Sequence, residues 1–220
     1  MTPQTVYDQL REVIERLITV NLSVTQFFPS IRTGANGEAI ISRKASSSIA
    51  LKNIPYEEIY VELERTQAFD IKLIDGGLLI LQYHFDHAGS LLQHRLAYFP
   101  SPVLPSIDES PALYEQDELY GDVIARQLVR FPIRFDYAPS QAQDIVHPVS
   151  HLTLGQYENC RIPVAGPLSP ASFALFIVRN FYARAYKRNK NVFDRKHLPI
   201  SQITTITDAE RRISYFVCGR

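Results

Sequence analysis

The sequence predicts an α+β fold in which an antiparallel β-sheet is covered by an N-terminal helix and a long C-terminal helix. Helical spacing of apolar residues is clearest over 5–20 and 170–188, while the stretch 59–99 alternates apolar and polar residues between turn signals. Strands do not alternate with helices as they do in parallel sheets. With 45% hydrophobic residues, the 220-residue chain can bury one core, so we expect a single domain over 1–220.

The first expected element is an amphipathic helix over residues 5–20. Its apolar side chains recur at spacings of three and four, and they are Val6, Leu10, Val13, Ile14, Leu17 and Ile18. Thr2 and Pro3 stand before it as the cap and first-turn residues. A short strand at Ala39–Ser42 follows among glycines, asparagine and serines that mark loops.

The central part of the chain predicts a meander of antiparallel strands. Alternation over Ile59–Glu64 is typical of a half-buried strand, and Ile71–Leu73 leads into a tight turn at Asp75–Gly77. Glycine tolerates the positive φ that such a turn requires. The return strand over Leu78–Asp86 and a further strand over Leu91–Phe99 complete the meander.

Prolines interrupt the chain between Pro100 and Pro111, which indicates a surface connection. The elements expected beyond it are a helix over 114–129, strands over 133–137 and 149–154, a short extended piece at 162–164, the helix over 170–188 and a last strand over 213–217. Ser169 and Pro170 open the C-terminal helix with a cap and a first-turn proline.

Several classes of protein do not fit the sequence. No apolar run approaches the 18 residues that a membrane span needs, and the N-terminus lacks a basic region followed by an apolar run. Two cysteines cannot form a disulfide scaffold, so we expect a cytoplasmic protein without a membrane partner. Phosphate-loop, dinucleotide-binding and nucleophile-elbow motifs are absent, and we expect no cofactor.

Charge is distributed unevenly along a chain with 23 basic and 23 acidic residues. Six acidic and no basic residues lie between 108 and 122, whereas seven basic residues and one acidic residue lie between 179 and 196. Basic side chains interleaved with aromatic ones are typical of surfaces that bind RNA or single-stranded DNA. The candidate nucleic-acid-binding residues are Arg179, Arg184, Lys187 and Arg188. A solvated helix end and a surface covered by the acidic segment are the alternatives.

Five of the six histidines lie between 84 and 151. On a strand, His84 and Asp86 would lie on one face about 7 Å apart, close enough to be candidate metal ligands. His147 and His151 would lie about 13 Å apart in an extended chain, which is too far for one ion. Alternatively, the histidines bond to backbone groups of the core.

Acid–base chemistry without a metal is a further interpretation of these residues. A histidine can accept or donate a proton near neutral pH, and cations can stabilise a charged transition state. Metal-independent RNA cleavage needs little else, because the ribose 2′-hydroxyl supplies the nucleophile. The candidate catalytic residues are His94, Arg95, Arg134, Asp136, His147 and His151. In this hypothesis His147 or His151 removes a proton, His94 or Arg95 stabilises the leaving side, and the basic helix end holds the RNA backbone.

Several motifs together resemble a bacterial family of unknown function over almost the whole chain. They are Tyr83-His84-Phe85, His94-Arg95-Leu96-Ala97-Tyr98, Arg134-Phe135-Asp136-Tyr137, His147-Pro148-Val149-Ser150-His151-Leu152 and Cys160-Arg161-Ile162-Pro163-Val164. The resemblance implies an accessory protein of mobile or phage-defence gene clusters, with nucleic-acid or toxin-related work. A homo-oligomer, or a complex with a protein partner from the same gene cluster, is expected.

Three functions compete on these grounds. A nucleic-acid-acting protein, the favoured function, predicts that the basic helix end and the histidines share one continuous surface. A non-enzymatic interaction protein, such as an antitoxin or complex subunit, predicts an exposed apolar patch. A nucleotide sensor predicts an enclosed pocket lined by arginine and tyrosine.

Overall fold

A computed structural model describes residues 1–42, 54–103, 131–157, 159–194 and 203–217. Three sequence features lie outside these residues. They are the helix expected over 114–129, the acidic segment over 108–122, and the basic residues Arg195 and Lys196.

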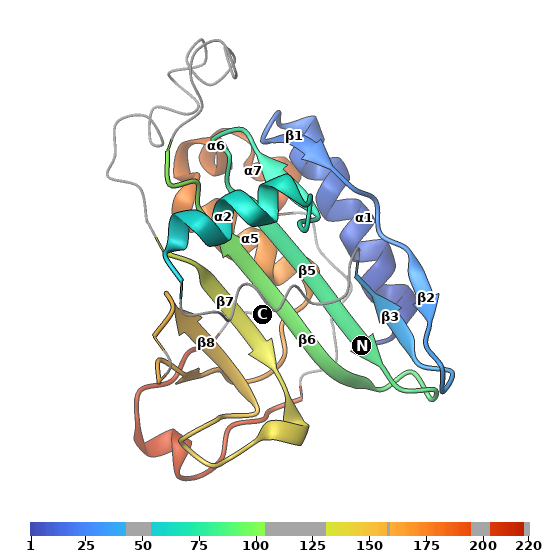
Figure 1. The fold of residues 1–220 in the computed structure, drawn as a ribbon, viewed down its shortest axis with the longest axis vertical. Helices are drawn as coiled ribbons and strands as arrows, with labels where there is room; N and C mark the ends of the chain where they lie inside the picture. Colours follow the sequence, from blue (N-terminus) through green and yellow to red (C-terminus); the bar gives the residue numbers. More distant parts are fainter. Residues whose placement is uncertain (43–53, 104–130, 158, 195–202, 218–220) are drawn as a thin grey trace.

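The described residues form an antiparallel sheet of nine strands, in which the path β1-β4-β5-β6-β7-β8-β9 is extended by β3 beside β5 and by β2 beside β3 (Figure 1). The strands are β1 Ser23–Gln26, β2 Ile31–Thr33, β3 Ala39–Ile41, β4 Ile71–Leu73, β5 Leu78–Phe85, β6 Leu91–Phe99, β7 Ile133–Tyr137, β8 Ser150–Leu154 and β9 Ile162–Pro163. The expected α+β fold with an antiparallel sheet is confirmed, as are its central hairpins.

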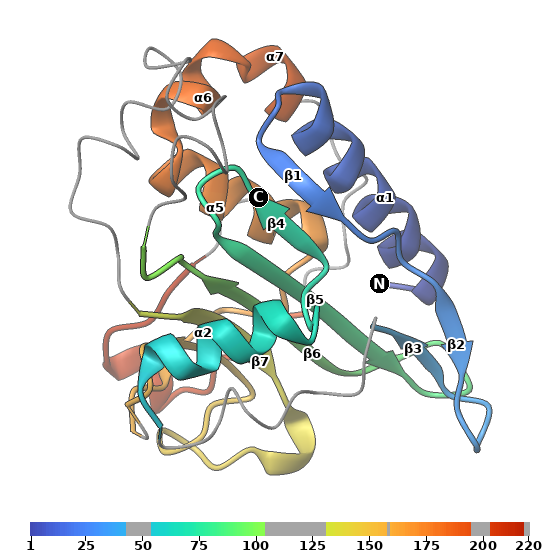
Figure 2. The same cartoon turned by 45° about the horizontal axis from the view of Figure 1, so that its top comes forward.

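Helices lie on both faces of the sheet. α1 (Pro3–Thr19) and α5 (Pro170–Phe181) pack on one face, and α2 (Tyr56–Arg65) packs on the other, as Figure 2 shows. The caps form as expected, with the Thr2 and Ser169 hydroxyls accepting hydrogen bonds from backbone N–H groups in the first helical turn.

Alternation along the strands divides the core between these two faces. On β5, Leu79 and Leu81 contribute to the core beneath α1 and α5, whereas Leu78 and Ile80 contribute to the smaller core beneath α2. The face that carries α1 and α5 is called the α5 face below, and the opposite one the α2 face.

The strand expected over Ile59–Glu64 was wrong, because these residues belong to α2. Ile59 and Leu63 are four apart and both buried, while Val61, which should share their face in a strand, is exposed. A helix satisfies this burial pattern, and a strand does not.

The long C-terminal helix is also divided. α5 ends at Phe181, and α6 (Ala183–Arg188) and α7 (Lys190–Phe193) follow after breaks. At the first break the buried Tyr182 leaves helical geometry, and its hydroxyl donates to the Asp75 carboxylate in the β4–β5 turn. This contact fixes the helix break over the hairpin.

Two edge strands, β1 and β2, had no counterpart in the sequence prediction. The last strand expected over 213–217 is reduced to a single parallel bridge between Phe216 and Val164. Short strands at the edge of a sheet carry few burial constraints, so their sequences show weak periodicity.

Candidate functional site

Register on the α2 face brings together three of the predicted site residues. Arg95 on β6 pairs with Asp136 on β7, and Asp136 pairs with His151 on β8. Directly opposed residues of antiparallel strands project from the same face. Arg134 lies two positions before Asp136 and therefore shares this face. These four residues form the cluster that we call the Arg–Asp–His cluster.

Asp136 is the centre of this cluster. The Nε of Arg95 donates to its Oδ1 at 3.0 Å, and the Nε of Arg134 donates to its Oδ2 at 2.6 Å. His151 Nε2 lies 3.7 Å from Oδ2. Within the described part of the chain, the terminal nitrogens of the two guanidiniums make no hydrogen bond to protein. One carboxylate thus orients two cations and leaves their outer donors for a ligand.

Electrostatics keep this carboxylate ionised. Burial alone would raise the pKa of Asp136, but the adjacent charges of Arg134 and Arg95 outweigh burial and hold the pKa below its ordinary value. With two guanidiniums and one carboxylate, the cluster carries a net positive charge at neutral pH. Such a charge favours anionic ligands.

His151 is buried and neutral at neutral pH. Burial lowers its pKa more than the charge of Asp136 raises it. Its Nδ1 lies 2.9 Å from the carbonyl oxygen of Pro148, and a carbonyl only accepts, so Nδ1 carries the proton. The unprotonated Nε2 therefore faces Asp136.

His147 packs edge-on against His151, with 4.7 Å between ring centroids. The rings lie closer than the separation of about 13 Å expected for an extended chain, because the chain bends at Val149 between the two histidines. The chain turns back before β8 begins. His147 is half-buried, and its Nδ1 is buried without a hydrogen-bond partner. A substrate would therefore meet the ring at its Nε2 edge.

His94 does not join this cluster, because it lies on the α5 face. Neighbouring residues of a strand point to opposite faces, so His94 cannot share a face with Arg95. It is 1% exposed, and its Nε2 accepts a hydrogen bond from the Leu168 backbone N–H at 3.0 Å. Burial lowers its pKa to about 4. His94 therefore bonds to a backbone group of the core, which is the alternative to metal binding and acid–base catalysis that the sequence left open.

The candidate metal ligands His84 and Asp86 have separate partners. His84 Nε2 lies 3.0 Å from a carboxylate oxygen of Glu38. Asp86 accepts hydrogen bonds from the backbone N–H groups of Ala88 and Ser90 in the β5–β6 turn. Among the residues that the structure describes, no group of three His, Cys, Asp or Glu side chains could hold a metal ion.

The basic helix end lies on the other side of the sheet from the Arg–Asp–His cluster. Arg179 belongs to α5, and Arg184, Lys187 and Arg188 belong to α6, whose buried Ala185 packs into the core of the α5 face. Among the residues that the structure describes, these two groups therefore lie on different faces of the sheet and not on the continuous surface expected of a nucleic-acid-acting protein. Figure 2 shows α5 and α6 away from α2, the helix on the face of the cluster.

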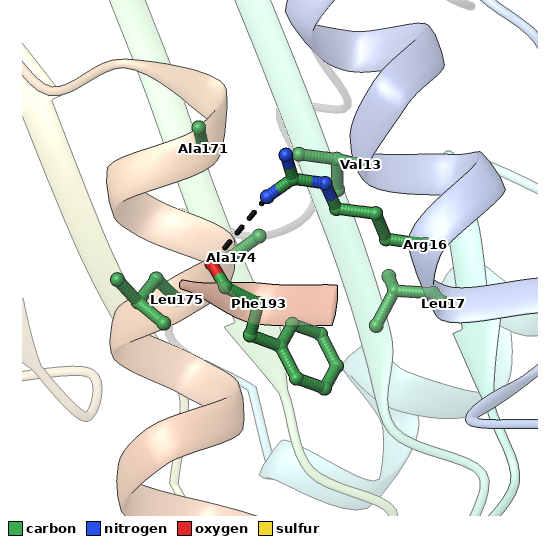
Figure 3. A pocket seen from close by; sticks show the side chains of 7 residues that line it. All are labelled: Val13, Arg16, Leu17, Ala171, Ala174, Leu175 and Phe193. Atoms are coloured by element: carbon green, nitrogen blue, oxygen red, sulfur yellow. Dashed lines mark hydrogen bonds between the residues drawn. The ribbon is translucent and has the colours of Figure 1, made fainter. Parts of the chain in front are cut away.

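Two further expectations concern pockets and apolar patches. A pocket between α1, α5 and α7 is lined by apolar side chains and by Arg16, which donates to the Phe193 carbonyl (Figure 3). It contains no tyrosine, unlike the pocket expected of a nucleotide sensor. Exposed apolar side chains occur near the β1 and β2 edge at Val24, Phe28 and Ile31.

Thr153 is a candidate site residue that the sequence prediction missed. It pairs with Arg134 and lies two positions after His151 on β8, so it belongs to the same face. The alternation that marked His151 on this strand would have identified it.

The fold and the cluster define an α+β protein with an antiparallel sheet and a cationic, histidine-containing polar site on one face. The chain belongs to the family described as an uncharacterized conserved protein (DUF2290), whose family model matches residues 22–218. Membership of a family of unknown function agrees with the sequence resemblance. No curated protein and no solved structure matches the chain. Within the described residues, the structure has no helix suited by length and apolar character to span a membrane.

Proposed function

We propose that this protein binds RNA on the α2 face of the sheet and cleaves it without a metal ion. One observation carries the proposal: Asp136 fixes two guanidiniums beside a pair of contacting histidines. The cations for a phosphate are thus held on strands β6 and β7, and a group that can accept a proton, His147, lies beside them in the segment before β8.

Arg95 and Arg134 are the groups that hold the phosphate in this proposal. Their side chains are 20% and 18% exposed, so a ligand can reach them. Each uses Nε for Asp136 and retains terminal donors with the planar geometry that suits phosphate oxygens. Because Asp136 fixes the guanidiniums before RNA binds, little side-chain freedom is lost on binding.

His147 is the base in the proposed reaction, and His151 is a positioning residue. His151 is enclosed between Asp136 and His147, whereas His147 is half-buried and reachable. His147 Nε2 removes the proton of a ribose 2′-hydroxyl, and the 2′-oxygen bonds to the adjacent phosphorus. The phosphorus–O5′ bond breaks, and the O5′ takes a proton from water. The products are a 2′,3′-cyclic phosphate and a 5′-hydroxyl end, and His147 returns its proton to solvent.

Arg95 stabilises the charge that develops on the leaving oxygen. His94 has no part in this scheme, since it lies on the α5 face. The basic helix end has none either, because the sheet separates it from the cluster. We place the activity in the cytoplasm and in the defence or toxin setting that the sequence resemblance implies.

Single-stranded RNA cleavage in the presence of a chelator tests this proposal. His147→Ala is expected to lower the cleavage rate about 100-fold or more, because it removes the proton acceptor. The matched control is His87→Ala, which removes an exposed histidine in the β5–β6 turn and should leave the rate unchanged. A 2′-deoxy substitution at the cleaved nucleotide should block the reaction.

Two outcomes would count against the proposal. One is a wild-type protein that cleaves no RNA with the chelator present. The other is cleavage that persists at the wild-type rate in His147→Ala.

A further inference from the structure

We infer that Thr153 and Arg134 form a subsite for one phosphate group on the α2 face. The inference rests on the proposed function, which identifies the natural ligand as RNA. The subsite itself needs only a phosphate group, so inorganic phosphate is enough to test it.

The Thr153 hydroxyl is the observation that points to a ligand. Thr153 is 5% exposed, and its Oγ1 is buried without a hydrogen-bond partner. Most buried side-chain polar atoms have a partner, because an unpaired one loses its hydration without replacement. The oxygen therefore lacks a group that a bound molecule would supply.

The position of Thr153 indicates what kind of molecule it would be. Thr153 lies directly opposite Arg134, whose other cross-strand neighbour is Ala97 on β6. Thus a hydroxyl and a guanidinium lie side by side, and the neighbour of Arg134 on β6 is small. Farther along the row, Ile80 on β5 pairs with Ala97, so this bulky side chain lies two strands away from Arg134.

These two groups favour a tetrahedral oxyanion over a cation or a neutral ligand. The guanidinium of Arg134 only donates hydrogen bonds, and the hydroxyl of Thr153 can donate as well. Asp136 already accepts the Nε–H of Arg134, so it does not compete for the terminal donors. A phosphate can place one oxygen on the hydroxyl and others on the guanidinium.

A valine would have nearly the same shape as Thr153 without the unpaired oxygen. Thr153→Val is therefore expected to unfold at the same or a higher denaturant concentration than the wild type. The same substitution should weaken the binding of inorganic phosphate about tenfold, because a hydrogen bond to a charged group is lost. Thr153→Ser retains the hydroxyl and should bind phosphate within about threefold of the wild type.

Isothermal titration of inorganic phosphate into the full chain measures these affinities. Equal affinity of wild type and Thr153→Val, or no binding to the wild type, would overturn the subsite. A Thr153→Val protein that unfolds more easily than the wild type would show that the hydroxyl has a structural role, and this too would overturn it.

The titration also separates this inference from the proposed function. His147→Ala should bind phosphate like the wild type while losing RNA cleavage. Phosphate binding that depends on Thr153 in a protein without ribonuclease activity would keep the subsite and refute the proposed function. RNA cleavage by a protein whose phosphate binding does not depend on the Thr153 hydroxyl would keep the proposed function and refute the subsite.

Discussion

Asp136→Ala is expected to lower the free energy of unfolding by about 3 kcal/mol, because it leaves two guanidiniums on the sheet without their shared carboxylate. The loss should be smaller for a double substitution that removes cationic and anionic groups together, such as Asp136→Ala with Arg134→Met. Urea unfolding measures both differences.

The control for this experiment is Asp208→Ala. The Asp208 side chain is 98% exposed and contacts Arg211 only at 3.8 Å, so its loss should change the free energy of unfolding by less than about 0.5 kcal/mol. If Asp136→Ala unfolded like Asp208→Ala, the cluster would not be the rigid arrangement on which phosphate binding depends.

Acidification is expected to destabilise the protein through His94. Its pKa is about 4 in the folded state, below the ordinary value of 6.5, because the ring is buried. The unfolded state therefore takes up a proton first as the pH falls. The stabilisation is fully present above pH 6.5 and is lost progressively down to about pH 4. The total loss amounts to about 3 kcal/mol.

Unfolding experiments between pH 7.5 and 4 measure this dependence. His94→Gln offers an oxygen that can accept from the Leu168 N–H and does not titrate, so most of the slope should disappear in this variant. His151 contributes in the same direction, because its pKa is also lowered by burial. Asp136 contributes to the pH dependence only at lower pH. Its pKa is lowered, so its carboxylate stays ionised and stabilises the fold until the pH falls far enough to protonate it. An unchanged slope in His94→Gln would contradict the assignment.

Local sequence signals predicted much of the fold because the relevant interactions are local. The Thr2 and Ser169 caps bond to residues three positions away, and the Asp75–Gly77 turn needs only its own glycines. The wrong prediction of a strand over Ile59–Glu64 also arose from using local sequence signals alone. Ile59 and Leu63 fit a strand and a helix equally well, and only the exposure of Val61 distinguishes them.

The candidate site was predicted only in part, because alternation along a strand assigns residues to a face but does not show which distant segments meet there. Alternation along β6 alone would have placed His94 and Arg95 on opposite faces. By contrast, the contact between His147 and His151 depends on a bend at Val149 before β8 begins, and no sequence pattern indicated this bend. The separation of the basic helix end from the cluster follows from long-range packing of α5, which periodicity does not report.

Whether the α2 face or the basic helix end holds RNA is the central question, and the salt dependence of RNA binding answers it most directly. A 2′-O-methyl RNA, which lacks the free nucleophile, allows binding to be measured without cleavage. For the double substitution Arg95→Gln and Arg134→Gln, we expect weaker binding and a slope of log K against log salt that is shallower by about 1. Arg179→Gln with Lys187→Gln, which alters the helix end, should leave both quantities unchanged. A slope that changes only with the helix-end pair would contradict the account.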